Sequence, residues 1–228
     1  MTEAITDIAF ELDVEALFKR AHVEPGSDDA KEFAALVNNI QEVGRPKALY
    51  KGSYIEARGE DTVTIDRVTF TSRALRRNLD KSQRVFPYVA TCGKEVDEIG
   101  IPQGDFLKEF WLDTIKATLL GVSGRHLGDL LDRKYRLGKT STMSPGSGDA
   151  TVWPIEQQRE LFSLLGDVEN LIGVRLTDSS LMLPNKSVSG IRFPTEIAFQ
   201  SCQLCHRENC DGRRAAFDKE LWESVQHD

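Results

Sequence analysis

The sequence predicts an α+β protein folded as a single domain. Helical and strand-like patterns are mixed along the 228 residues, without the strict strand–helix alternation of a parallel sheet. The longest helical pattern lies near the middle, and shorter alternating stretches predict an antiparallel sheet. With 40% hydrophobic and 29% charged residues, the chain has the composition of a soluble globular protein.

The first hundred residues predict two helices and several strands. Residues 4–12 alternate as a strand does, and 13–21 and 28–44 have helical periodicity, the second ending at Gly44. Residues 48–66 predict a hairpin that turns around Gly59 to Asp61. Residues 84–93 read as a buried strand that carries Cys92 at its end.

A long helix is expected from Asp105 to about Tyr135. Its apolar residues recur every three or four positions and form one buried stripe. Three glycines interrupt the middle, and because glycine costs about 1 kcal/mol against alanine in a helix, they predict close packing against another element. The stripe comprises Phe106, Phe110, Trp111, Ile115, Leu119, Val122, Leu127, Leu130, Leu131 and Tyr135, and the glycines are Gly121, Gly124 and Gly128.

The C-terminal half begins with a loop rich in glycine, serine and proline, followed by a helix with Pro154 in its first turn and Gly166 at its end. Residues 167–174 predict a short helix. Two strands are expected around Pro184 to Lys186, and an amphipathic helix over 212–226.

The charge pattern excludes several classes of function. The net charge is −7, so we expect no general nucleic-acid binding, which needs a positive surface. The densest basic stretch, Arg73 to Arg84, is interpreted as a solvated helix face. The acidic N-terminus does not resemble a signal peptide, and no apolar run is long enough for a membrane helix. A cytoplasmic protein without membrane contact is therefore expected.

From Thr142 to Phe193 the sequence resembles the activation (reactivation) domain of cobalamin-dependent methionine synthase. The similar pieces are "SPGSGD", "WPIEQQRELFSLLG", "IGVRLTDSSLMLPNK" and "SVSG", in the family's order and with similar gaps. The resemblance implies a curved α+β domain that binds S-adenosylmethionine beside cobalamin and returns oxidised cobalt(II) to methylcobalamin. We expect residues 1–228 to form one such unit, with only general similarity over 1–100.

The resemblance assigns the cofactor-facing edge to a loop and a strand. The loop residues are Ser144, Pro145, Gly146, Ser147, Gly148 and Asp149, and the strand residues are Ser187, Ser189, Gly190 and Arg192. The family has an arginine and two tyrosines where this chain has Thr142, Ser147 and Arg192. Loss of a charge-assisted contact to a carboxylate predicts weak S-adenosylmethionine binding or none. The loop glycines are expected to leave N–H groups open for an anion or for a partner's main chain.

The cysteine-rich C-terminal segment, residues 200–228, contains "CQLCHRENC". In a reducing compartment, thiols spaced as Cys202, Cys205 and Cys210 predict a metal centre more than disulfides. The spacing is similar to that of corrinoid iron–sulfur proteins, which favours a 4Fe–4S cluster with Cys92 as the fourth ligand rather than His227. Zinc held with His206 and free thiols are the alternatives. Arg213 and Arg214 follow directly.

Together these patterns predict an accessory protein for reductive activation of a corrinoid-dependent methyltransferase, through an iron–sulfur cluster, in an anaerobic or microaerobic cell. The chain lacks the Asp-x-His-x-x-Gly motif of cobalamin-binding modules. Cobalamin would therefore come from a partner corrinoid protein, and electrons from a donor such as a ferredoxin. The alternatives are an S-adenosylmethionine-binding reactivation domain and a non-catalytic interaction module stabilised by zinc. No residue is assigned a catalytic role.

Overall fold

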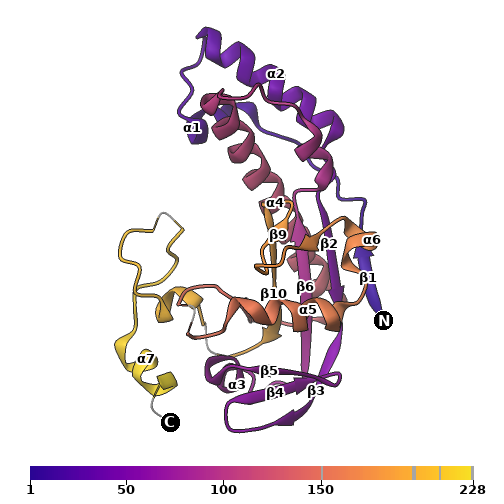
Figure 1. Ribbon diagram of the computed structural model, residues 1–228, viewed down its shortest axis with the longest axis vertical. Coiled ribbons are helices and arrows are strands. Elements are labelled where there is room, and N and C mark those ends of the chain that lie inside the picture. Colours follow the sequence, from indigo (N-terminus) through magenta and orange to yellow (C-terminus); the bar gives the residue numbers. More distant parts are fainter. Residues whose placement is uncertain (150, 197–198, 211, 227–228) are drawn as a thin grey trace.

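The computed structural model describes residues 1–149, 151–196, 199–210 and 212–226, and confirms the α+β class with an antiparallel sheet and a long central helix. Eight strands form one sheet, and each pairing in it is antiparallel. They are β1 (Thr2–Ile5), β2 (Lys47–Lys51), β3 (Ser53–Arg58), β4 (Thr62–Ile65), β5 (Val68–Thr71), β6 (Arg84–Thr91), β7 (Thr140–Met143) and β10 (Ser187–Pro194). Figure 1 shows this sheet below an arm of helices.

Strand β6 is the strand around which the sheet is organised. Strand β2 pairs with its second half, from Lys47 opposite Thr91 to Tyr50 opposite Tyr88. Strand β10 pairs with residues Thr91 to Phe86. Because β2 and β10 both pair with residues 88–91, they must lie on opposite edges of β6. Strand β7 extends the sheet beyond β10, and the expected hairpin turn at Gly59 to Asp61 joins β3 to β4.

Helix α4 (Phe106–Tyr135) joins the helical arm to the sheet. The Asp105 side chain caps it by accepting the N–H of Lys108 at 3.1 Å. Its first half packs with α1 (Val14–Ala21) and α2 (Asp28–Val43) through Trp111, Ile115 and Leu119. Its second half lies on the sheet through Leu127 and Leu131. The predicted stripe is therefore confirmed from Trp111 onward, where it serves two separate cores. Its first two members are wrong, because Phe106 and Phe110 in the first turns of α4 are exposed.

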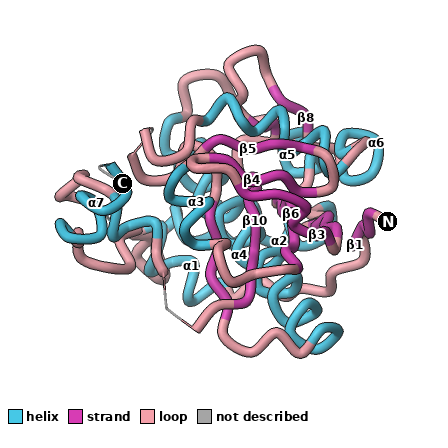
Figure 2. Tube along the Cα trace, turned by 90° about the horizontal axis from the view of Figure 1, so that it is seen from below, coloured by secondary structure: helices cyan, strands magenta, loops and turns pink. Residues whose placement is uncertain are grey.

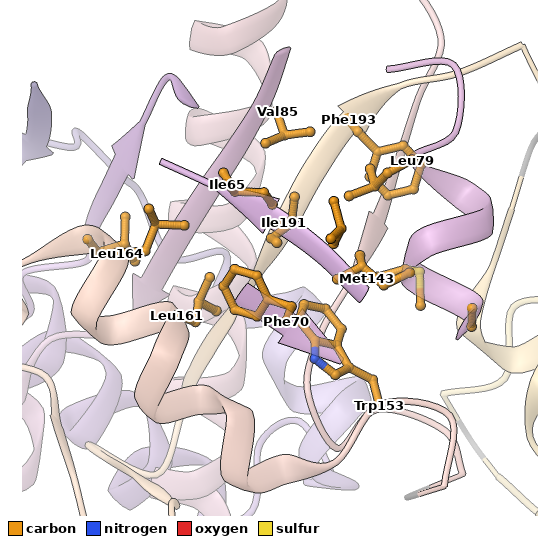
Figure 3. Close-up of a cluster of buried hydrophobic side chains, with 14 of the residues drawn as sticks. Ile65, Phe70, Leu79, Val85, Met143, Trp153, Leu161, Leu164, Ile191 and Phe193 are labelled. Atoms are coloured by element: carbon orange, nitrogen blue, oxygen red, sulfur yellow. The ribbon is translucent and has the colours of Figure 1, made fainter. Parts of the chain in front are cut away.

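The largest core lies on the other face of the sheet, under α3 (Arg73–Asn78), α5 (Gln158–Leu165) and α6 (Val168–Ile172). Figure 2 shows α5 and α6 on one side of β6 and β10, with α4 on the other. In Figure 3 the rings of Phe70 and Trp153 meet edge to face, with centroids 5.8 Å apart, beside Leu161 and Ile191. The sheet is thus covered on both faces, which fixes its register.

The predicted strand over residues 4–12 is wrong beyond Ile5, where β1 ends. Ile8 and Leu12 are buried, but in two different cores, on the sheet and in the helical arm. The backbone between them bonds a side chain instead of a neighbouring strand, because Gln41 accepts from the N–H of Leu12 at 2.8 Å and donates to the carbonyl of Phe10 at 3.0 Å. The alternation of apolar and polar residues after Ile5 therefore belongs to a connecting segment and not to a strand.

Two C-terminal expectations also need correction. The terminal helix α7 (Lys219–Gln226) is shorter than residues 212–226. The residues before it close around the cysteine segment, where the N–H of Asp218 donates to the carbonyl of Gln203 at 2.9 Å. The strands on either side of Pro184 do not pair together, since β9 (Met182–Leu183) pairs with β8 (Arg175–Leu176) and β10 pairs with β6. Short 3-10 helices lie at η1 (Lys94–Glu98), η2 (Ile155–Gln157) and η3 (Ser201–Leu204).

The aromatic centre of the helical arm should dominate its stability. Phe33 is fully buried, with its ring 5.4 Å from that of Trp111 and 5.7 Å from that of Phe18. We expect Phe33→Ala to lower the free energy of unfolding by about 3–5 kcal/mol, because it removes the contacts and leaves a cavity. Urea denaturation measures this. The control is Phe106→Ala, whose side chain is 78% exposed and should cost little; equal losses in both variants would contradict the packing described.

Candidate functional site

The loop Ser144–Asp149 is held by its own backbone. The N–H of Gly146 donates to the carbonyl of Trp153 at 2.8 Å, and that of Ser147 donates to Ser144 at 3.1 Å. The expectation that the Gly146 N–H is open is therefore wrong. Gly146 has φ +73°, and a Cβ there would lie 2.9 Å from Ile155, so only glycine fits. Pro145 is buried, while Gly146, Ser147 and Gly148 form the exposed tip.

Gly190 lets the start of this loop lie directly on β10. A Cβ at this position would be 2.5 Å from the carbonyl oxygen of Met143 and 2.6 Å from the Ser144 hydroxyl. The two predicted serines of β10, which both precede Gly190, are bonded within the protein. Ser187 donates to Pro184 at 2.8 Å, and the buried Ser189 donates to Gln158 on α5, on the opposite face of β10 from Arg192. Of the predicted strand residues, Gly190 and Arg192 thus share the face that meets α4.

A polar cluster surrounds Arg192 on that face. Arg192 stands opposite Thr142 in the β10–β7 pairing and forms an ion pair with Asp132 of α4 at 3.2 Å. Its guanidinium packs against Gly128, where a Cβ would lie 3.1 Å from Nη1, so the close packing expected of the helix glycines is present at this one. The expectation is wrong at Gly124, where a Cβ would meet nothing within 4 Å. Within the described part of the chain, Nε of Arg192 is buried and has no hydrogen-bond partner.

Tyr88 of β6 completes the cluster. Burial raises the pKa of its hydroxyl, which hydrogen-bonds with the side chains of Ser144 and Thr142, while the charges of Arg192 and Arg214 act in the opposite direction. The residues at this edge therefore offer one cation and three hydroxyl groups side by side. Such a set can hold a carboxylate or another anionic group.

The cysteine segment is closed by one arginine. The guanidinium of Arg213 donates to the carbonyls of Cys202 at 3.3 Å, Cys205 at 3.1 Å and Ala215 at 3.1 Å, and also to that of Arg207. The N–H of Arg214 donates to the sulfur of Cys202 at 3.4 Å. Cys202 and Cys205 are half-buried and Cys210 is exposed. One side chain thus bonds backbone carbonyls within the predicted metal-ligand motif and one beyond its C-terminal end.

The structure brings the cysteine segment against the Ser144–Asp149 loop. A Cβ on Gly148 would lie 3.1 Å from the carbonyl oxygen of Ser201 and 3.7 Å from Cβ of Cys205. Nδ1 of His206 lies 3.6 Å from the Asp149 carboxylate. Hydrogen bonds from Thr151 hold the pKa of Asp149 below its usual value, and His206 adds to this effect. The two features that the sequence singled out separately are neighbours.

The ring of His206 packs against two aromatic side chains. Its ring centroid lies 4.3 Å from that of Phe217 and 4.4 Å from that of Trp222 on α7. With Nδ1 turned to Asp149, the ring links the cysteine segment, the terminal helix and the loop. This arrangement does not support the zinc alternative, in which His206 is a ligand. His227, the other histidine considered as a ligand, lies outside the described residues.

Cys92 lies apart from the other three cysteines. It is fully buried in the core of the helical arm, with Phe33 and Trp111, whereas Leu204 of the cysteine segment belongs to the core under α3 and α5. Burial raises the pKa of the Cys92 thiol to about 12, which favours the neutral form over a thiolate ligand. Among the residues that the structure describes, no three His, Cys, Asp or Glu side chains are grouped around one metal position.

Sequence reasoning missed three parts of this site. Asp132 and Tyr88 enter it from α4 and β6, and Arg213 was noted only as a charge beside the cysteines. Tyr88 offers one signal, because it is the polar aromatic residue in an otherwise apolar stretch of strand. Asp132 offers none, since the helix pattern shows which face is apolar but not which strand residue lies opposite an acid.

The fold and the site together define an α+β domain with an antiparallel sheet, in which a glycine-rich loop lies against β10 next to the Arg192 cluster. Residues 125–211 match the family model described as "Vitamin B12 dependent methionine synthase, activation domain". The chain is similar to the crystal structure of the MetH reactivation domain bound to AdoHcy, with a TM-score of 0.62 and 15% identity over 88% of this chain and 81% of that one. The predicted resemblance and fold are confirmed.

No curated protein matches this chain significantly. The family match begins within α4 and ends just beyond Cys210, so it includes the loop, β10 and the cysteine motif. The solved structure adds that the fold extends over the N-terminal part, where the sequence offered only general similarity. Within the described part of the chain, no helix is both long and apolar enough to cross a membrane.

Because the Ser144–Asp149 loop contacts the cysteine segment at Gly148, a methyl group added at Gly148 should loosen that segment. Gly148 and Gly138 both have positive φ, +88° and +68°, so alanine costs about 1–2 kcal/mol of strain at either position. A Cβ at Gly138 meets nothing within 4 Å, whereas one at Gly148 meets Ser201. We expect Gly148→Ala to speed limited proteolysis of residues 201–215, with Gly138→Ala as the matched control. Equal rates in the two variants would show that the segment does not rest on the loop.

Proposed function

We propose that this chain is an activation module for a cobalamin-dependent methyltransferase of the methionine synthase type. The observation that carries this proposal is the family match over residues 125–211 together with the fold similarity over 88% of the chain. These comparisons favour an activation-domain function over the purely iron–sulfur accessory protein that the cysteines suggested. The partner would bring the cobalamin, and the chain would cover its face.

The docking surface of this proposal is the loop tip beside β10. Gly146, Ser147 and Gly148 are exposed there, and Gly190 brings the loop onto the sheet. A protein that covers a cobalt(II) corrinoid can favour reduction only by binding the reducible form more tightly than the resting form. The electron for cobalt(I) would come from a low-potential donor such as a ferredoxin, directly or through an iron–sulfur centre on the cysteine segment.

The docking role is tested by blocking the loop tip. We expect the full chain to speed formation of cobalt(I) in a corrinoid protein from the same cell, supplied as cobalt(II) with a low-potential donor and followed by its visible spectrum. Ser147→Trp should remove most of that effect, because it places an indole on the docking surface. Thr69→Trp on β5, also exposed, is the matched control. A wild-type chain that binds and activates none of the cell's corrinoid proteins would rule the proposal out.

We also propose that the Arg192 cluster receives the amino-acid end of an adenosyl ligand such as S-adenosylmethionine or AdoHcy. The family's loop arginine is replaced by Thr142, but Arg192 stands directly opposite Thr142 in the strand pairing. A guanidinium is therefore present one strand away, next to Tyr88 and Ser144. To bind a carboxylate it would exchange part of its ion pair with Asp132, which predicts weaker binding than a preformed free arginine would give.

Calorimetry with AdoHcy tests the ligand. We expect Arg192→Ala to weaken binding by about ten- to a hundredfold, the value of one charge-assisted hydrogen bond. Arg175→Ala on β8 changes the net charge equally at an exposed position and should leave the affinity unchanged. Equal affinities for the two variants would remove Arg192 from the site. Absence of any binding by the wild-type chain would reject the adenosyl ligand without affecting the docking test.

A further inference from the structure

We propose that Cys202, Cys205 and Cys210 hold one metal centre as three thiolates, without Cys92 and without His206, and that the centre lies beside the Ser144–Asp149 loop. The structure supplies what the spacing could not. It argues against Cys92 and His206 as ligands, and it places the segment that carries the three thiols against the Ser144–Asp149 loop.

The backbone around the thiols is already closed. Arg213 bonds carbonyl oxygens at Cys202 and Cys205 and also at Ala215, beyond the motif. Metal binding therefore has little loop to order, which lowers the entropic cost of bringing the ligands together. The thiol side chains are not grouped in the structure described, so binding requires them to turn inward. Cys210 is free to do so, because it is exposed and is followed closely by Gly212.

The groups around the thiols are hydrogen-bond donors that suit thiolate ligands. The N–H of Arg214 donates to the sulfur of Cys202, the kind of bond that supports a metal-bound thiolate. The guanidinium of Arg213 brings positive charge to the same loop, and this offsets the negative charge of three thiolates on a metal or cluster. Hydrogen bonds to sulfur and nearby charge are also the means by which proteins set the reduction potential of an iron–sulfur cluster.

The surroundings of Cys92 and His206 argue against both as metal ligands. Cys92 is buried in the helical arm, in a different core from the cysteine segment, and is excluded as a ligand by position. His206 is held between Phe217 and Trp222 with Nδ1 towards Asp149. A centre with three thiolates keeps its fourth position for a small ligand from solution or from a partner, as open metal sites do.

An electron-transfer role for this centre rests on the proposed activation function. The cysteine segment touches the loop at Gly148 and at Asp149, so the centre would stand next to the surface that is proposed to meet the corrinoid. An iron–sulfur centre held there, once reduced, would supply one electron to the partner's cobalt(II), which would become cobalt(I). The oxidised centre then takes one electron from a low-potential donor of the ferredoxin class.

Metal content tests the site directly. The full chain is purified without oxygen, reconstituted with ferrous iron and sulfide or with zinc, desalted, and analysed for iron, sulfide and zinc. We expect Cys202→Ala, Cys205→Ala and Cys210→Ala each to lose most of the metal, whereas Cys92→Ala keeps it. Circular dichroism checks that each variant is folded. A wild-type chain that keeps neither iron nor zinc, or Cys92→Ala that loses as much as the other variants, would overturn the proposal.

Alkylation of the wild-type chain gives a test that needs no variant. With metal bound, iodoacetamide should modify Cys202, Cys205 and Cys210 at least tenfold more slowly than after chelation, as measured by mass spectrometry of peptides. Cys92 should stay unmodified in both states until the chain is unfolded, because it is fully buried. Equal rates with and without metal would reject the site.

The cobalt assay separates the metal site from its role. If the metal-free Cys202→Ala chain speeds cobalt(I) formation as well as the wild type does, the electron-transfer role is wrong and the docking role stands. If the wild type binds zinc alone, the metal site stands and electron transfer is excluded. If the metal-loaded wild type speeds no reduction, the proposed activation function fails while the metal analysis remains valid.

Discussion

The antiparallel pairing of β10 with β6 is the constraint on which the rest of the structure depends. Residues Ser187 to Arg192 run opposite Thr91 to Phe86, so a segment near the C-terminus is fixed to a strand about a hundred positions earlier. This pairing turns alternate β10 residues to opposite faces. Ser189 and Ile191 enter the core under α5, and Gly190 and Arg192 turn to α4. A shift of one residue would exchange these faces and separate Arg192 from Asp132 and Tyr88.

Glycine at position 190 then decides what can lie over the strand. The Ser144–Asp149 loop passes so close that a single methyl group would meet the backbone of Met143. The same loop supports the cysteine segment at Gly148 and Asp149. The loop therefore contacts both β10 beside the Arg192 cluster and the segment that carries the three thiols.

Local patterns predicted much of the fold. The helices at 13–21, 28–44 and 105–135 were correct to within a residue or two, because each has a capping residue or a glycine stop and a regular apolar stripe. The strand 84–93 and the turn at Gly59 to Asp61 were also correct. Besides the strand pairing around Pro184, predictions failed at residues 4–12 and 212–218, where side chains bond the backbone. Gln41 bonds the backbone of the first segment, and Arg213 bonds the backbone around the second. Such bonds leave no periodic pattern in the sequence by which they could be predicted.

The sequence by itself determined the fold class, the cysteine motif and the loop that carries the family resemblance, because these depend on residue types and short spacings. Tertiary structure alone decided which of them meet. Cys92 is hydrophobic enough to be drawn into the helical arm, while His206 is held by two aromatic rings that come eleven or more residues later. Arg192 stands opposite Thr142 in the β10–β7 pairing and forms an ion pair with Asp132 of α4. Such contacts form when whole faces of helices and strands are buried together. The two partners of each contact lie too far apart in the chain for a short stretch of sequence to contain both.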